Sequence, residues 1–182
     1  MRSVCMLCGA VVLAVFSSVA SRAPQTEAKP QISDEEYIKQ ALSAAPEGVA
    51  KNATVARLGA DGNMRVLRKG TNDFVCIVMG TDKMCNDSNA REIAHAMINQ
   101  QPPPEKLGIS YMLAGDEGGS NTDPMAEQKT ADNHWVVDGP HLMVMGPAAK
   151  TLAYPRGKDA DPSQPYMMWV GTPYEHAMIP VK

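Results

Sequence analysis

Two cysteines in the middle of the sequence, Cys76 and Cys85, limit the fold more than any other feature if the chain is exported. In an oxidising compartment a single remaining pair of thiols usually forms a disulfide. The turn-forming residues 80–82 lie between the two cysteines and let the chain fold back. We therefore predict a disulfide that closes a loop of about ten residues and stabilises the fold by about 2.5 to 3 kcal/mol. The alternatives for this pair are a thiolate metal site and a redox-active dithiol.

The N-terminal residues predict export. Arg2 precedes the almost wholly apolar segment 4–16, and small residues lead up to Ala20, which is the pattern of a secretory signal peptide covering 1–20. The apolar segment is shorter than the roughly 20 residues that cross a bilayer, and no later segment reaches that length. We therefore expect a soluble periplasmic or secreted protein with no integral membrane segment in the mature chain. Cys5 and Cys8 spell C-x-x-C, but cleavage would remove them.

Composition and charge indicate one ordinary globular domain. Of the 182 residues, 44% are hydrophobic and 20% are charged, which excludes a disordered tail, a collagen-like fibre and a coiled coil. The formal net charge is −3, and the basic residues are scattered, so we expect no nucleic-acid partner. Residues 21–31 are rich in proline, alanine and charge and predict a flexible lead-in. The folded domain is expected to span 32–182.

Hydrophobic periodicity predicts two helices. Ser33 and Glu36 form a capping-box pattern, and apolar residues then recur at helical spacing as far as Pro46. A second helix is predicted to begin near Asp87 or Ser88 and to end before the prolines at 102–104.

Short β-branched or alternating segments separated by glycine and proline predict a set of strands. These segments are 53–58, 64–69, 74–79, 109–114, 135–137, 141–145, 166–170 and 176–181. Residues 115–133 are predicted as a long loop, and Pro180 favours an edge strand. Because strands and helices do not alternate, we predict an α+β single domain with a mostly antiparallel sheet and two helices packed on it.

The C-terminal segment 166–181 reads YMMWVGTPYEHAMIPV, with SNTDP at 120–124 and GPH at 139–141 upstream. Together these segments resemble a family of small exported bacterial proteins, and the likeness extends over most of the mature chain. The resemblance implies bacterial export and a single domain. It implies no activity, cofactor or catalytic residue, so expectations about function rest on the residues themselves.

A repeated H-x-M pattern predicts a metal site. The pattern occurs at His141-Leu142-Met143, continues to Met145, and recurs at His176-Ala177-Met178. On a strand, side chains two residues apart share a face, so imidazoles and thioethers would meet if the two strands are neighbours. This donor set suits Cu(I), and copper is the cofactor that we consider. The alternative is that methionine fills an aromatic-poor core, because 13 methionines stand beside only 5% aromatic residues.

We expect the second ring nitrogen of each ligating histidine to be held by a carboxylate or a carbonyl, and Asp138 or Glu175 could supply the carboxylate. Trp169 would cover the site with its ring. We also expect each histidine to lie near a common point with at least one thioether, and we expect access from solvent. The predicted function is therefore that of an exported binding or accessory protein and not of an enzyme.

Two further functions stay open. One is a small exported hydrolase or isomerase that uses Asp138, His141, Glu175 and His176 as acids and bases. The sequence contains none of the motifs G-x-S-x-G, H-E-x-x-H and S-x-x-K, and it has no glycine-rich phosphate loop. The other is a structural or envelope-interaction protein in which both histidines are hydrogen-bonded core residues.

Overall fold

The structure, a computed structural model, describes residues 32–59 and 63–181. The predicted signal peptide and lead-in, including both N-terminal cysteines, lie outside the described residues. In the part of the chain that is described, no helix is long and apolar enough to cross a membrane.

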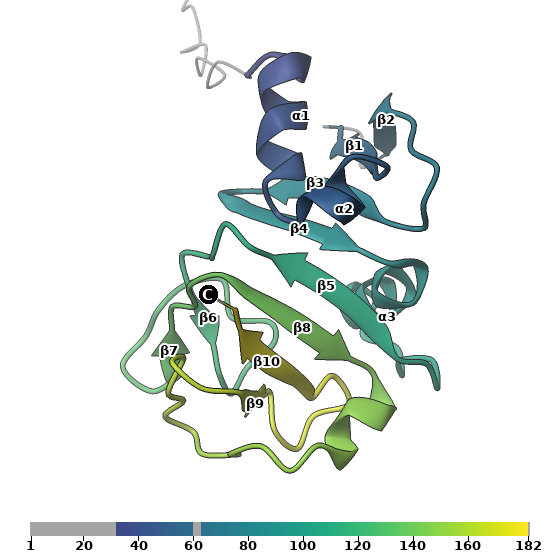
Figure 1. The fold of residues 1–182 in the computed structure, drawn as a ribbon. Helices are drawn as coiled ribbons and strands as arrows, with labels where there is room; N and C mark the ends of the chain where they lie inside the picture. Colours follow the sequence, from purple (N-terminus) through teal and green to yellow (C-terminus); the bar gives the residue numbers. More distant parts are fainter. Residues whose placement is uncertain (1–31, 60–62, 182) are drawn as a thin grey trace, which may run out of the picture. The chain divides into compact units, whose positions relative to one another are not determined.

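The described residues form an eight-stranded sheet in the order β2-β1-β3-β4-β5-β8-β10-β9 (Figure 1). Within it β1 pairs with β3 in parallel, and the other neighbours pair antiparallel. A short ribbon of β6 and β7 forms a second sheet. The strands are β1 (Thr54–Leu58), β2 (Met64–Arg68), β3 (Val75–Met79), β4 (Asp82–Asn86), β5 (Gly108–Met112), β6 (Gly119–Ser120), β7 (Trp135–Val136), β8 (His141–Met145), β9 (Tyr166–Met168) and β10 (His176–Pro180).

Two helices of more than two turns pack on this sheet, which confirms the predicted α+β class. Helix α1 (Asp34–Leu42) begins at Ser33, whose side chain accepts a hydrogen bond from the Glu36 amide at 3.2 Å, as the capping pattern predicted. Helix α3 (Ser88–Ile98) begins after Asp87, whose side chain accepts from the Ala90 amide at 2.7 Å. The short helices α2 (Glu47–Ala50) and η1 (Pro147–Thr151) were not predicted.

The predicted disulfide is present and lies under α1. Cys76 on β3 and Cys85 on β4 are directly opposite each other, with their Cα atoms 4.0 Å apart. Both are fully buried in the core cluster that contains Tyr37 and Ala41 of α1. Because side chains alternate along a strand, the face of β3 and β4 that carries the disulfide packs against α1. The residues next to each cysteine along its strand point to the opposite face.

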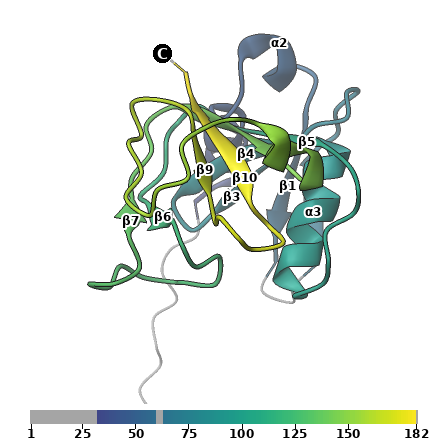
Figure 2. The ribbon, with the colours of Figure 1, turned by 90° about the horizontal axis from the view of Figure 1, so that it is seen from below.

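That opposite face is covered from two sides. Helix α3 packs there through Ile93, which shares a buried cluster with Met145. The β6–β7 ribbon packs through Val136, which shares another with Met168 and Met178. In Figure 2, α3 and the ribbon lie on opposite sides of β9 and β10. The strand face between them carries the candidate site.

Strand β4 was not predicted, since residues 80–82 were interpreted as a turn and 83–86 were assigned to no element. The structure pairs β3 with β4 from Val75–Asn86 to Met79–Asp82. The prediction that Pro180 lies on an edge strand is also wrong, because β10 lies between β8 and β9 in the sheet. Pro180 itself nevertheless has a neighbouring strand on one side only. Strand β9 makes its last pair at Met178, so β10 has only β8 beside it at Pro180, and no donor is needed on the free side.

Candidate functional site

Strands β8 and β10 are neighbours, and their register brings the five predicted ligands to one face of the sheet. Met143 of β8 lies directly opposite Met178 of β10. Residues that face each other in an antiparallel pair point to the same side, and so do residues two apart on one strand. His141 and Met145 therefore share the face of Met143, and His176 shares the face of Met178.

All five line one cavity of about 240 Å³ between the sheet, α3 and the β6–β7 ribbon. Its walls are dominated by methionine, with contributions from β3, β4, β5, β8, β9, β10 and α3. The lining methionines are Met79, Met84, Met97, Met112, Met143, Met145, Met168 and Met178. Met143, Met145 and Met178 were predicted as ligands from the sequence, and the other five methionines were not. One usable signal was the period of two on β4, which places Asp82, Met84 and Asn86 on one face of the strand.

Neighbouring strands add a thioether beside each histidine. Met112 of β5 is paired with His141 of β8. Met168 of β9 is paired with His176 of β10. Directly opposite residues have Cβ atoms about 4.5 to 5.5 Å apart, so each imidazole has a methionine side chain beside it.

Both histidines present an unpartnered ring nitrogen. The Nδ1 atom of His141 lies 2.8 Å from the carbonyl oxygen of Gly139, and that of His176 lies 3.0 Å from the carbonyl oxygen of Tyr174. A carbonyl only accepts, so Nδ1 carries the proton and Nε2 of a neutral ring keeps its lone pair. Both Nε2 atoms are buried and have no hydrogen-bond partner among the described residues. Each imidazole therefore has a nitrogen that is available to coordinate a metal ion. Each of the two histidines is only 1% exposed.

Burial keeps His176 neutral. The loss of solvent lowers the pKa of His176 to about 4, and His141 acts in the same direction, while the Tyr174 carbonyl and Glu175 act against it. At neutral pH, Nε2 of His176 is therefore unprotonated and available as a metal ligand.

Trp169 lines the cavity beside His176. The two rings meet edge to face with their centroids 4.7 Å apart. The indole Nε1 donates to the carbonyl oxygen of Ser120 at 2.8 Å, and the Trp169 amide donates to the carbonyl oxygen of Asn121 at 2.9 Å. Trp169 has a φ of 58°, so the chain leaves the strand direction there and ends β9 earlier than predicted.

The two carboxylates expected to orient the histidines have other partners. Asp138 accepts a hydrogen bond from the Tyr166 hydroxyl at 2.7 Å. Glu175 accepts from Nε of Arg156 at 3.0 Å and from the Gly171 amide at 3.1 Å. Backbone carbonyls, the other partner expected from the sequence, hold the histidine Nδ1 atoms, and neither Asp138 nor Glu175 takes that role.

Asp138 is a buried carboxyl group with strongly altered electrostatics. Burial raises the pKa of Asp138, and the nearby Asp116 raises it further, while Tyr166 and His141 oppose the shift. The same burial, together with the charge of Asp138, raises the pKa of Tyr166 well above its usual range. The hydrogen bond between Tyr166 and Asp138 joins the first residue of β9 to the turn before His141 and holds that turn in place.

One end of the cavity is acidic. Asp82 and Asp116 line it together with the apolar residues. Burial raises the pKa of Asp82, and the charges of Asp116 and Glu117 contribute to the increase. The register places Asp82 near His141. The Cys85–Tyr111 pair puts Met84 beside Met112, and Met112 is opposite His141. Asp82 lies two residues before Met84 on the same face of β4.

The four residues of the hydrolase alternative do not gather in a polar cleft. His141 and His176 line the methionine-rich cavity, whereas neither Asp138 nor Glu175 is among its lining residues. Glu175 precedes His176 directly, and its carboxylate is bound to Arg156. The geometry thus separates the carboxylates from the free Nε2 atoms that would need them as partners.

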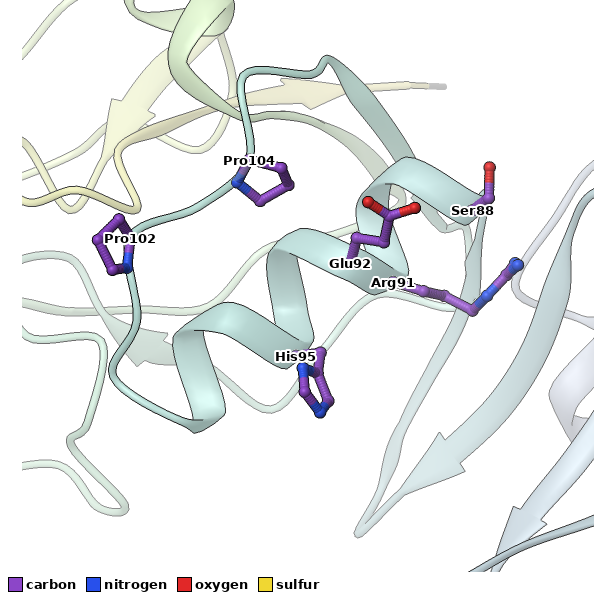
Figure 3. Close-up of a pocket in the computed structure, with 6 residues that line it drawn as sticks. All are labelled: Ser88, Arg91, Glu92, His95, Pro102 and Pro104. Atoms are coloured by element: carbon purple, nitrogen blue, oxygen red, sulfur yellow. The ribbon is translucent and has the colours of Figure 1, made fainter.

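A second depression, of about 520 Å³, lies over the outer face of α3. Figure 3 shows that the side chains of Arg91, Glu92 and His95 point in different directions there. Lys106 forms an ion pair with Glu92 at 2.6 Å, and Arg91 donates to the Asp73 carbonyl at 2.7 Å. These charged groups are engaged with their own neighbours and do not converge on a common point.

Among residues 32–59 and 63–181, no group of three or more histidine, cysteine, aspartate and glutamate side chains is placed to hold a metal ion. A metal site in this part of the chain therefore depends on thioether sulfur. Comparisons of the chain with family models, curated proteins and solved structures found no match.

Proposed function

We propose that this protein binds a soft monovalent metal ion of the Cu(I) type in the methionine-lined cavity, as an exported binding or accessory protein. The observation that carries the proposal is the pair of buried histidines, each with an unpartnered Nε2 atom beside thioether side chains in one cavity.

The chemistry of these donors favours a soft ion. Thioether sulfur and imidazole nitrogen are ligands that suit Cu(I), whereas Mg²⁺ and Ca²⁺ require several oxygen ligands. Structural zinc sites use cysteine, histidine and carboxylate ligands in tetrahedral sets, and methionine is not among them. A cavity with eight methionines and two imidazoles therefore matches Cu(I) better than any of these divalent ions.

Core packing by itself does not account for the two histidines. A buried polar atom left without a hydrogen bond costs about 1 to 3 kcal/mol, and this fold contains two such imidazole nitrogens on the same face. Leucine or methionine at both positions would fill the space without that cost. A metal ion bonded to Nε2 would remove this cost, so metal binding accounts for the two histidines where core packing alone does not.

The disulfide supports a place outside the cytoplasm for this function, because disulfides persist in oxidising compartments. Asp138 and Glu175, the two carboxylates of the hydrolase alternative, do not line the cavity and are bonded to Tyr166 and Arg156. Binding, storage or transfer of the ion therefore fits the arrangement better than hydrolysis or isomerisation.

The proposal is tested by anaerobic titration of the protein with Cu(I) in competition with a chromophoric Cu(I) chelator. We expect tight binding by the unaltered protein and a loss of affinity of tenfold or more when Met143→Leu and Met178→Leu are combined. Met64→Leu is the matched control, because Met64 is exposed on β2. Equal affinity in all three proteins, or no competition by the unaltered protein, would overturn the proposal.

A further inference from the structure

We infer that the cavity holds two soft metal ions, one at each histidine, with the Met143–Met178 pair between them. This inference rests on the proposed function and adds the number of ions and their positions.

The strand register separates the two histidines. His141 lies opposite Pro180, which is four residues after His176 on β10. At about 3.3 Å of rise per residue, the two histidines are offset by about 13 Å along the strands. Two nitrogens on one ion, with bonds of about 2 Å each, lie no more than about 4 Å apart. Because strand side chains stand roughly perpendicular to the sheet, this offset favours a separate ion at each imidazole over one shared ion.

Each histidine has its own set of thioethers. His141 has Met112 opposite it on β5 and Met143 two residues along its own strand. His176 has Met168 opposite it on β9 and Met178 two residues along its own strand. Since Ala177 pairs with Val144, the next position on β8, Met145, lies beside His176 on the same face. A two-ligand or three-ligand Cu(I) site can therefore form at either end without a ligand from the other.

The two ends differ in character. The His141 end also carries Asp82 and Asp116, whose negative charge attracts a cation entering from solvent. The His176 end has the Trp169 ring against the imidazole and is lined by buried methionines. We therefore assign the softer and tighter site to His176 and the entry site to His141, with the thioethers of Met143 and Met178 as the intermediate position.

Native mass spectrometry of the disulfide-bonded protein with Ag(I), a soft monovalent ion that does not change oxidation state under these conditions, tests the number of ions. We expect two Ag(I) ions per chain, and one in each of the single variants His141→Leu and His176→Leu. His95→Leu is the control and should keep two ions, because His95 is exposed on the outer face of α3.

The possible failures are distinguishable. One ion in the unaltered protein, lost completely in both histidine variants, would show a shared site and overturn the two-ion inference while leaving the proposed function intact. No ion in the unaltered protein would overturn both. A second test keeps both histidines and combines Met112→Leu with Met143→Leu. This variant should lose one ion and keep the ion at His176. Retention of both ions would contradict the assignment of these two thioethers to the His141 site.

Discussion

Acidification should destabilise the metal-free protein through His176. Burial lowers the pKa of His176 to about 4, whereas an unfolded histidine has a pKa of about 6.5. Between these two values the unfolded chain binds a proton that the folded protein does not, so the free energy of unfolding falls as the pH falls. The contribution is fully present above about pH 6.5 and is lost progressively down to about pH 4.

The size of this effect follows from the shift. A difference of about 2.5 pKa units at 1.36 kcal/mol each corresponds to about 3 kcal/mol over the whole window. Most of this, about 2.5 kcal/mol, is lost by about pH 4.5. Asp138 works in the opposite direction, because burial raises its pKa and a protonated carboxyl favours the folded state as the pH falls. The contribution of His176 must therefore be measured as a difference between proteins.

Urea unfolding followed by tryptophan fluorescence, at about pH 7.5 and about pH 4.5, measures that difference. We expect the loss of stability between the two pH values to be about 2.5 kcal/mol smaller in His176→Leu than in the unaltered protein. His95→Leu is the matched control and should retain the full loss. Equal losses in the unaltered protein and in His176→Leu would refute the conclusion that His176 is buried and neutral.

Three further predictions concern stability. Reduction of the Cys76–Cys85 disulfide should lower the free energy of unfolding by about 2.5 to 3 kcal/mol, measured in urea with and without reductant, and an unchanged midpoint would contradict the loop-closure argument. Tyr166→Phe removes the donor to buried Asp138 and should cost about 1 to 3 kcal/mol at neutral pH but less in acid, where the carboxyl is protonated; a pH-independent cost would count against this. Met178→Leu should change the stability of the metal-free protein by less than about 1.5 kcal/mol while weakening Cu(I) binding, and thermal unfolding with and without the ion separates the two effects.

The pattern of residues within each strand was enough to predict which side chains share a face. The spacing of His141 and Met143, and of His176 and Met178, placed each pair on one side of its own strand, as observed. The register between the two strands could not be predicted, because residues 147–165 connect β8 to β9 with little regular structure and no turn signal fixes the alignment. The offset between the histidines follows from that register and so became visible only in the fold.

The surroundings of the histidines were harder to predict for a different reason. Asp138 and Glu175 are near the histidines in sequence, but their carboxylates reach Tyr166 and Arg156, which the fold brings in from other segments. The carbonyls that hold Nδ1 belong to the residues two positions before each histidine, and backbone acceptors leave no mark on a sequence.

The disulfide, by contrast, was predictable, since only one pair of cysteines follows the predicted signal peptide and each then has only one partner. The helix caps were predictable because a cap depends on neighbouring residues alone.

X-ray absorption spectroscopy at the copper edge of the Cu(I)-loaded protein tests the central claim most directly, because it identifies the atoms bound to the metal. The proposed site predicts a first shell that combines thioether sulfur with imidazole nitrogen. The sulfur contribution should persist in protein that lacks residues 1–20, because the Cys76–Cys85 disulfide then takes both remaining cysteines. His141→Leu with His176→Leu should remove the imidazole contribution. A first shell of nitrogen and oxygen without sulfur would contradict the proposed methionine-lined site.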